Sequence, residues 1–416
     1  MRIDYSKETL AILESLQIQA EHAGGPFQRK SALDPRSLAE NMCRNSSNWT
    51  NDRPGLDASV NFFTAYQDRL PTKHEDAIDY PKLFLILECV SKEAEKLGIQ
   101  LPEAISIGTV CSGNLNAHVL QVADGQPAHL LVFNRQLFLF CDLFSRYIAR
   151  LIANEVEEHP GNLTLRTREP TKLEMQDLDA VVYYLINSIA FYRDDGGGIE
   201  LIVAIDKTNA QMPVLETDEV GTCFKEMMLV PMVAFVVAHE LMHVHVKHAK
   251  STGLPLDIRT PFEEELLCDT QGVVIAAQTA TTLCKNVYPQ GWQKFGAVAS
   301  LLFLSCLDIT QKAAYVLHNG TLPPRTMEDV DIEALENNQL DTYPTTLLRL
   351  QIAYAKLRED ISRLLAPNPA DWVFENSGWI DTFFVEAWKE MKGYYLNRHA
   401  ARSQALNIFR SLRKSP

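Results

Sequence analysis

The sequence predicts a predominantly helical α+β fold. The composition is that of an ordinary globular protein, with 46% hydrophobic and 22% charged residues in 416. Strand-like runs occur in the middle third, whereas helical patterns occupy both ends. Because the strand-like runs are short and separated by turn residues, we expect one small antiparallel sheet, made of two hairpins and packed against helices.

The first hundred residues are predicted to form a helical region. Apolar residues recur on one face over residues 5–21, and the breaker Gly24-Gly25-Pro26 follows. Residues 30–75 are polar and rich in Asn, Ser, Pro and Asp, which favours long loops and short helices. A stronger helical pattern covers residues 80–97, and Gly98 is expected to end that helix.

The middle of the chain holds the predicted strands. Each is a short apolar run bounded by turn residues: Ile105–Cys111, Asn116–Val122, His129–Asn134 and Ile199–Ile205. Residues 137–152 are apolar for too long to be a strand, so a buried helix is expected, and residues 171–192 follow a helical pattern. After residue 225 the chain is predicted to form helices joined by loops marked with Pro and Gly.

The charge balance bears on the class of partner. A formal net charge of −14 disfavours nucleic acid, because the summed field repels a polyanion, and it permits a basic protein substrate. Residues 389–416 are basic, with seven Lys or Arg and one Glu. They are expected to form a solvated amphipathic helix, with a partner or membrane contact as the alternative.

The sequence predicts a cytoplasmic protein without an integral membrane segment. A spanning helix needs about 20 apolar residues, and the longest apolar runs, residues 227–238 and 297–307, are shorter. The N-terminus does not resemble a secretory signal. The eight cysteines form no C-x-x-C pair, which favours reduced thiols. These patterns leave the oligomeric state open.

One motif carries the predicted chemistry: His239-Glu240-Leu241-Met242-His243, an H-E-x-x-H sequence in an apolar helical context. His239 and His243, at i and i+4, project from one helix face and can bind a single metal ion, with Glu240 beside that face. His245 and His248 are expected to be surface or hydrogen-bonded histidines, because the helical turn directs them elsewhere.

A catalytic zinc site normally has a third protein ligand and an open fourth position. The acidic segment Glu263-Glu264-Glu265 follows Pro261 and begins a second predicted helix. Glu265 is the expected third ligand, with Glu264 and Glu263 as lesser alternatives. Asp269, one turn later, is the expected acceptor that fixes a ligating histidine. The ordinary alternative is an acidic helix N-terminus stabilised by the helix dipole.

These residues resemble the gluzincin metallopeptidases, whose pattern is H-E-x-x-H on one helix and E-x-x-A-D on the next. Glu265-Leu266-Leu267-Cys268-Asp269 matches the second element, with Cys268 in place of Ala. His248 and Asn116-Ala117-His118 resemble features of the CAAX-prenyl-protease branch, whereas the short spacing between the two elements resembles the soluble Lit-type and ImmA/IrrE-type peptidases. The specific resemblance covers residues 225–275.

The resemblance implies a zincin-like metallopeptidase domain over residues 101–320, with an active-site helix and a glutamate helix. Helical regions over residues 1–100 and 321–416 would flank it. The implied cofactor is Zn²⁺, held by His239, His243 and Glu265, which would lower the pKa of a bound water toward about 7. Glu240 would then act as general base and return the proton to the leaving amine.

Two further features of such an enzyme have candidates in the sequence. A second donor for the oxyanion would be Tyr343, Arg349 or His318. The segment from Tyr343 to Arg349 resembles the H-P-x-x-x-x-R element of related peptidases, with Tyr in place of His; the alternative is a helix start at Pro344. An extended substrate would add to an exposed strand edge, for which Ile199–Ile205 and His129–Asn134 are candidates.

The sequence thus predicts a zinc-dependent endopeptidase acting on a cytosolic protein or peptide. One alternative is a catalytically idle regulator or binding protein on a metalloprotease scaffold, which the intact motif residues disfavour. Another is a deformylase, but Cys223 lacks the local signature of a deformylase ligand. The resemblance to Lit-type peptidases implies one specific protein target.

Overall fold

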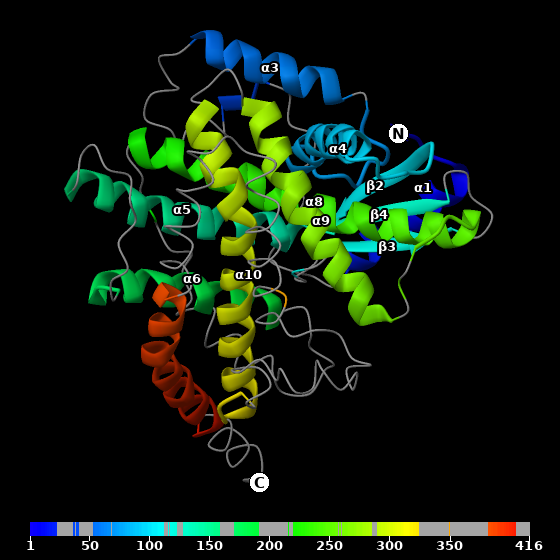
Figure 1. The fold of residues 1–416 in the computed structure, drawn as a ribbon. Helices are drawn as coiled ribbons and strands as arrows, with labels where there is room; N and C mark the ends of the chain where they lie inside the picture. Colours follow the sequence, from blue (N-terminus) through cyan, green and yellow to red (C-terminus); the bar gives the residue numbers. More distant parts are fainter. Residues whose placement is uncertain are drawn as a thin grey trace.

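The fold is seen in a computed structural model of the chain. It describes residues 1–22, 36–37, 39–40, 53–67, 69–111, 115, 117–122, 128–158, 170–190, 215, 219–256, 258, 260–284, 289–323, 349 and 382–404. Within these residues, a small sheet lies at one side of the molecule, next to a body of long helices (Figure 1). The predicted α+β class with mostly helical content is therefore confirmed, and the zincin-like core stays a prediction.

The N-terminal part contributes α1 (Lys7–His22), α3 (Arg53–Gln67) and α4 (Asp79–Lys96). The first and last agree with the predicted helices, and Gly98, with a φ of 80°, follows α4. Helix α3 lies in the polar region where loops and short helices were expected, and it has 15 residues. It is held by burial of Phe63, which packs with Ala77 and Ile78.

The sheet has the strand order β1-β2-β4-β3, formed by β1 (Arg2–Ile3), β2 (Ala104–Val110), β3 (Ala117–Gln121) and β4 (His129–Asn134). Strand β4 is parallel to β2 and antiparallel to β3, and β1 is parallel to β2. The predicted hairpin of β3 and β4 is therefore confirmed, whereas the predicted hairpin of β2 and β3 and the all-antiparallel sheet are wrong, because β4 lies between β2 and β3 and is parallel to β2. All six residues of β4 are buried, as in a central strand, whereas in the edge strand β3 only Ala117 is buried.

The corrected strand order changes the candidates for an exposed edge. His129–Asn134 is paired on both sides and is not an edge strand. Ile199–Ile205 lies outside the described residues. Strand β3 is the outer strand on the side of α8, since Lys247 of α8 donates a hydrogen bond from Nζ to the carbonyl oxygen of Val119, at 2.8 Å.

The helical body consists of α5 (Arg135–Glu158), α6 (Lys172–Ala190), α8 (Glu219–Thr252), α9 (Pro261–Cys284), α10 (Pro289–Asn319) and a helix over residues 382–404. The helices predicted for these parts of the chain are confirmed where the structure describes them. Helix α8 packs mainly against α9, α5 and α10, and it also contacts α4 and β3. It therefore lies between the sheet and the rest of the helical body (Figure 1).

One large hydrophobic cluster runs through the predicted regions. It contains Tyr80 of α4, Leu131 of β4 and Tyr395 of the helix over residues 382–404, all fully buried or nearly so. That last helix covers part of the basic segment, and its Arg398 forms a bidentate pair with Asp179 of α6 at 2.6 Å for both contacts. The region boundaries at residues 100 and 320 stay predictions.

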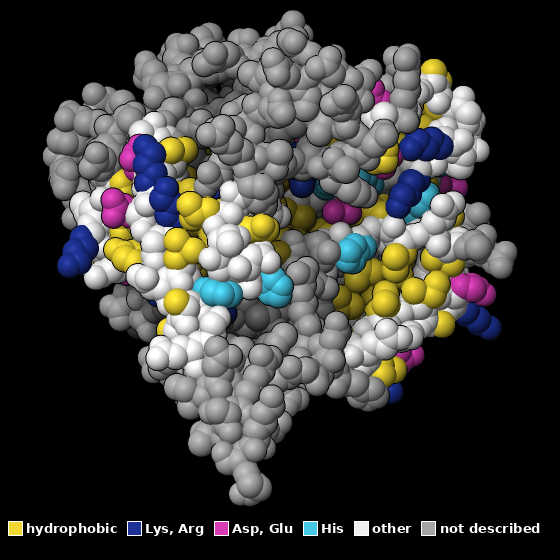
Figure 2. All heavy atoms as spheres, turned by 90° about the horizontal axis from the view of Figure 1, so that it is seen from below, with side chains coloured by type: hydrophobic (Ala, Val, Ile, Leu, Met, Phe, Trp, Pro, Cys, Tyr) yellow, Lys and Arg dark blue, Asp and Glu magenta, His cyan; other side chains and the backbone are white. Residues whose placement is uncertain are grey.

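In the part of the chain that the structure describes, two helices are long and apolar enough to cross a membrane by length and composition, Phe224–Thr252 and Val298–Asn319. Both are mostly buried, with 83% and 78% of their apolar windows inside the protein, as is typical of core helices. On the face in Figure 2, acidic and basic side chains of the described residues are interspersed rather than gathered by sign.

Candidate metal centre

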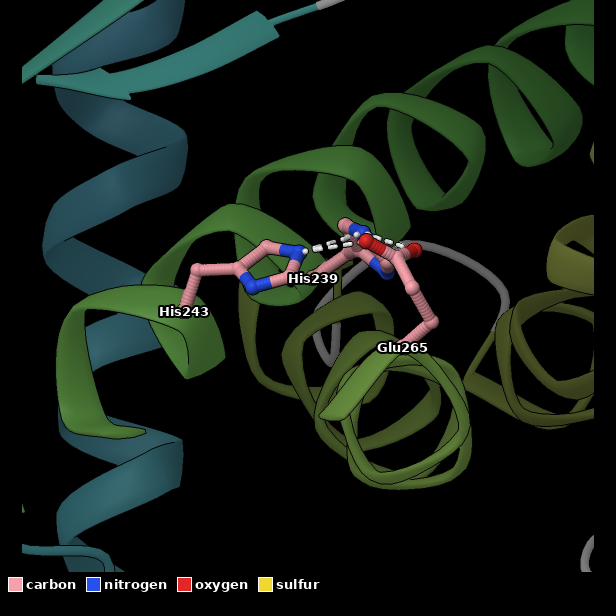
Figure 3. A group of neighbouring side chains, drawn as sticks. All are labelled: His239, His243 and Glu265. Carbon is pink, nitrogen blue, oxygen red and sulfur yellow. Dashed lines mark hydrogen bonds and ion pairs between the residues drawn. The ribbon is translucent and has the colours of Figure 1, made fainter. Parts of the chain in front are cut away.

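Helix α8 supplies the H-E-x-x-H residues and fixes their direction. Leu241 and Val244 are fully buried in the core, so the rotation of the helix is set by packing. His239 and His243 lie one turn apart, and Figure 3 shows both imidazole rings directed toward the carboxylate of Glu265. The packed face therefore holds both histidines in one orientation.

Helix α9 supplies the acidic residues. Its first turn is closed by a capping box, in which Glu263 N–H donates to Thr260 Oγ1 at 3.2 Å and Thr260 N–H donates to the Glu263 carboxylate at 3.0 Å. Gly272 lets α9 approach α8, since a Cβ there would lie 3.4 Å from the backbone nitrogen of His239. This close approach brings Glu265 and Asp269 to the histidines.

Three ligand atoms converge on one point between the helices. His239 Nε2 and His243 Nε2 are 3.2 Å apart, and they lie 3.6 and 3.3 Å from the two carboxylate oxygens of Glu265. Atoms about 2.0–2.2 Å from one ion at the corners of a tetrahedron lie about 3.3–3.6 Å apart. The 3.2 Å between the two nitrogens fits two corners of such a tetrahedron, and the Glu265 carboxylate, with one oxygen facing each nitrogen, can supply a third ligand atom.

The other nitrogen of each imidazole faces a second carboxylate. His239 Nδ1 lies 2.9 Å from Asp269 Oδ1, and His243 Nδ1 lies 3.0 Å from Glu264 Oε1. The contact of His243 with Glu264 is a hydrogen bond, whereas that of His239 with Asp269 is close but not aligned as one. A carboxylate that accepts from Nδ1 leaves the Nε2 lone pair of the same ring for a metal. The arrangement of the two rings is thus one that could hold a metal ion.

The electrostatics of the centre favour ionised carboxylates around a positive charge. Hydrogen bonding with His243 lowers the pKa of Glu264 to about 2. Burial raises the pKa of Asp269, but Arg349 and His239 outweigh it and hold that pKa well below its usual range. At His243 burial lowers the pKa of the imidazole, but hydrogen bonds with Cys268, Glu264 and Glu265 outweigh burial and raise that pKa to about 12. Without a metal, these acidic groups therefore favour a protonated His243, and a bound metal ion would take the place of the proton on Nε2.

Glu240 differs from the other acidic residues of the centre. It is 9% exposed, and among the described residues no hydrogen bond or ion pair engages its carboxylate. Glu264, Glu265 and Asp269 are all paired. The carboxylate of Glu240 is therefore available to a molecule bound in the centre, as a group that acts on a substrate must be.

The remaining predicted site residues lie in different places. Arg349 contacts Asp269 rather than standing free, and Tyr343 lies outside the described residues. His318 is exposed near the end of α10, where the carbonyl oxygen of neighbouring Leu317 contacts His399. The oxyanion role of these three residues stays a prediction. The side chain of Cys223 is also outside the described residues.

Sequence reasoning missed one partner. Glu264 was considered only as a lesser ligand, yet its carboxylate bridges His243 and Lys250, at 3.0 and 2.9 Å. The available signal was its position one residue before Glu265 at the start of α9. His245, which follows the motif, contacts the carbonyl oxygen of Gln100 through Nδ1 at 2.7 Å, as expected of a hydrogen-bonded histidine.

Comparison with known proteins gives no relative. No family model matches the chain, no curated protein matches it, and no solved structure matches it. Whatever function is proposed must therefore come from the centre itself.

Proposed function

We propose that this protein is a zinc-dependent endopeptidase that cleaves a protein or peptide substrate, which we expect in the cytoplasm. The observation that carries the proposal is the convergence of His239 Nε2, His243 Nε2 and a Glu265 carboxylate oxygen, with all three ligand atoms within 4.8 Å of one another. When bound there, zinc would supply Lewis acidity and a nucleophile at neutral pH.

The residues of the chain divide the remaining work. Asp269 and Glu264 orient the histidines through their Nδ1 atoms. Glu240, adjacent to His239 in sequence and free of other partners among the described residues, takes a proton from the attacking water and returns it to the leaving amine. The proton balance closes, because the water proton removed in the first step reaches the amine in the second.

Strand β3 is the candidate edge for an extended substrate. It is the outer strand next to α8, and Lys247 links the two elements through Val119. A peptide added alongside a sheet edge gains main-chain hydrogen bonds that do not depend on its sequence. Specificity for one target would then come from side-chain contacts on either side of that edge.

The test is a Glu240→Gln variant compared with wild type in zinc content and cleavage. Gln keeps the size of the side chain but removes the base, so one zinc per chain should remain while cleavage is lost. Zinc is measured by mass spectrometry of the purified protein, and cleavage by profiling new N-termini in cells that express each form. The control is Glu226→Gln, an exposed position on the same helix paired with Lys225, which should keep both properties.

Three outcomes contradict the proposal. Cleavage by the Glu240→Gln variant would exclude Glu240 as the base. A wild-type protein that binds no zinc at neutral pH would exclude the metal centre. A wild-type protein that binds zinc but produces no new N-termini would indicate a binding protein on a metalloprotease scaffold.

A further inference from the structure

Arg349 reaches the metal centre from a distant part of the chain. It is 80 residues from Asp269, yet its Nε donates to Asp269 Oδ2 at 2.6 Å and its Nη2 donates to Asp269 Oδ1 at 2.8 Å. This is the bidentate geometry in which a planar guanidinium matches a carboxylate. The Asp269 side chain is fully buried, and 19% of the Arg349 side chain is exposed.

The pair lies directly behind a metal ligand. Asp269 Oδ1, which accepts from Arg349 Nη2, is the same oxygen that lies 2.9 Å from His239 Nδ1. Arg349 Nη2 also lies 3.8 Å from Glu265 Oε2. One guanidinium therefore contacts the carboxylate that orients one ligand and lies close to the carboxylate of another.

Two of the nitrogens of Arg349 are committed to Asp269, which points away from a role in contacting substrate. The two-point contact instead fixes the Asp269 carboxylate in the plane of the guanidinium fork, so the oxygen that faces His239 cannot rotate away.

We propose that Arg349 is a positioning residue of the metal centre, acting through Asp269 to hold His239, and with it Glu265, in ligating geometry. The proposal rests on the metal-binding part of the proposed function and is independent of the peptidase activity. It also gives Arg349, which follows α10 in the chain, a direct part in building a site whose other residues lie on α8 and α9.

The experiment measures zinc affinity of the full chain by competition with a chromophoric chelator. Arg349→Met should weaken zinc binding about 10–100-fold, the usual cost of losing a group that orients a metal ligand. Arg349→Lys, which keeps the charge but loses the fork, should give an intermediate loss. The visible spectrum of the Co²⁺-loaded protein, which reports ligand geometry, should change in both variants.

The matched control is Arg398→Met. Arg398 forms the same bidentate pair with Asp179, between α6 and the helix over residues 382–404. The Arg398→Met variant should lower the stability of the fold and leave zinc affinity and the Co²⁺ spectrum unchanged. A second control is the double variant Asp269→Asn with Arg349→Met: if Arg349 acts through Asp269, its removal should weaken zinc binding less than threefold further in the Asn background.

The outcomes separate the two proposals. If wild type binds no zinc, the proposed function fails before this inference is reached. If wild type binds zinc and both Arg349 variants bind it equally well, the positioning role is excluded. Additive losses in the double variant would exclude the route through Asp269. Should Arg349→Met fail to fold, Arg349→Lys and the Co²⁺ spectrum decide the question.

Discussion

Two buried carboxylates are stabilised in opposite ways: Asp269 in the candidate metal centre and Glu75 beside α1. Asp269 is fully buried and Glu75 is 3% exposed. Asp269 is paired with Arg349 and faces His239. Glu75 instead accepts hydrogen bonds from neutral groups of Gln17 and Thr109, and no Lys, Arg or His of the described residues pairs with it.

The pKa values of the two groups follow from this difference. Burial raises both, but Arg349 holds the pKa of Asp269 well below its usual range. At Glu75, hydrogen bonds from Thr109 and Gln17 do not offset burial, and the pKa rises to about 8. In this comparison the neutral donors at Glu75 satisfy the buried carboxylate without keeping it ionised, whereas the counter-charge of Arg349 keeps Asp269 ionised beside the candidate metal centre.

Breaking the buried pair is expected to have the largest effect. Asp269→Asn leaves the Arg349 guanidinium without its counter-charge, which should cost about 3–5 kcal/mol of unfolding free energy. Urea unfolding of the zinc-free protein at pH 7 measures it. Asp179→Asn is the comparison, because the Arg398 side chain of that pair is 30% exposed, against 19% for Arg349. The Asp179→Asn variant should therefore lose less unfolding free energy than Asp269→Asn. Equal losses would show that burial does not set the cost.

Much of the fold could be predicted from the sequence, and so could the grouping of His239, His243 and Glu265 in the centre. The H-E-x-x-H spacing is local, since i and i+4 share a helix face, and Glu265 follows from the same logic applied to the next helix. Arg349 was singled out, but for another role. Its pairing with Asp269 is a contact across 80 residues, and no periodicity reports such contacts. Glu264 was ambiguous because adjacent glutamates differ only in their angle around α9.

The sheet shows the same limit. The positions of β2, β3 and β4 were predicted to within about a residue, because apolar runs and turn residues are local signals, whereas the two-residue strand β1 was not predicted. Strand order is not local: β4 pairs with both β2 and β3, and no periodicity within His129–Asn134 reports which strands lie beside it. The six consecutive buried positions show only that both faces of the sheet are covered at this strand.

The second prediction tests Glu75 through the pH dependence of stability. Its pKa is about 8 in the folded protein and near 4.5 without the fold. The folded state thus binds the proton more tightly, and the contribution of Glu75 to stability is full below about pH 4.5 and is lost as the pH rises toward 8. The loss is roughly 3–5 kcal/mol, at about 1.4 kcal/mol per unit.

Glu75→Gln should abolish that part of the pH dependence, since an amide does not titrate. Unfolding free energies of wild type and variant at pH 5 and pH 9 isolate the effect as a difference of differences. The variant should gain on wild type as the pH rises. A constant difference between the two proteins would show that Glu75 is ionised at both pH values, and that Gln17 and Thr109 suffice to replace a counter-charge.

The smallest effect is expected at the exposed cation of the centre. Lys250 pairs with Glu264 just as Arg349 pairs with Asp269, but 55% of its side chain is exposed, against 19% for Arg349. Water and salt screen such a pair, so Lys250→Met should change the unfolding free energy by about 0–1 kcal/mol. The loss should vanish in 1 M salt, at a screening length of about 3 Å, whereas the loss from Asp269→Asn should persist. A large, salt-insensitive loss from Lys250→Met would mean that water is excluded from the Glu264 side of the centre as fully as from the Asp269 side. The contact of His243 with Glu264 would then depend on a cation as strongly as the contact of His239 with Asp269 does.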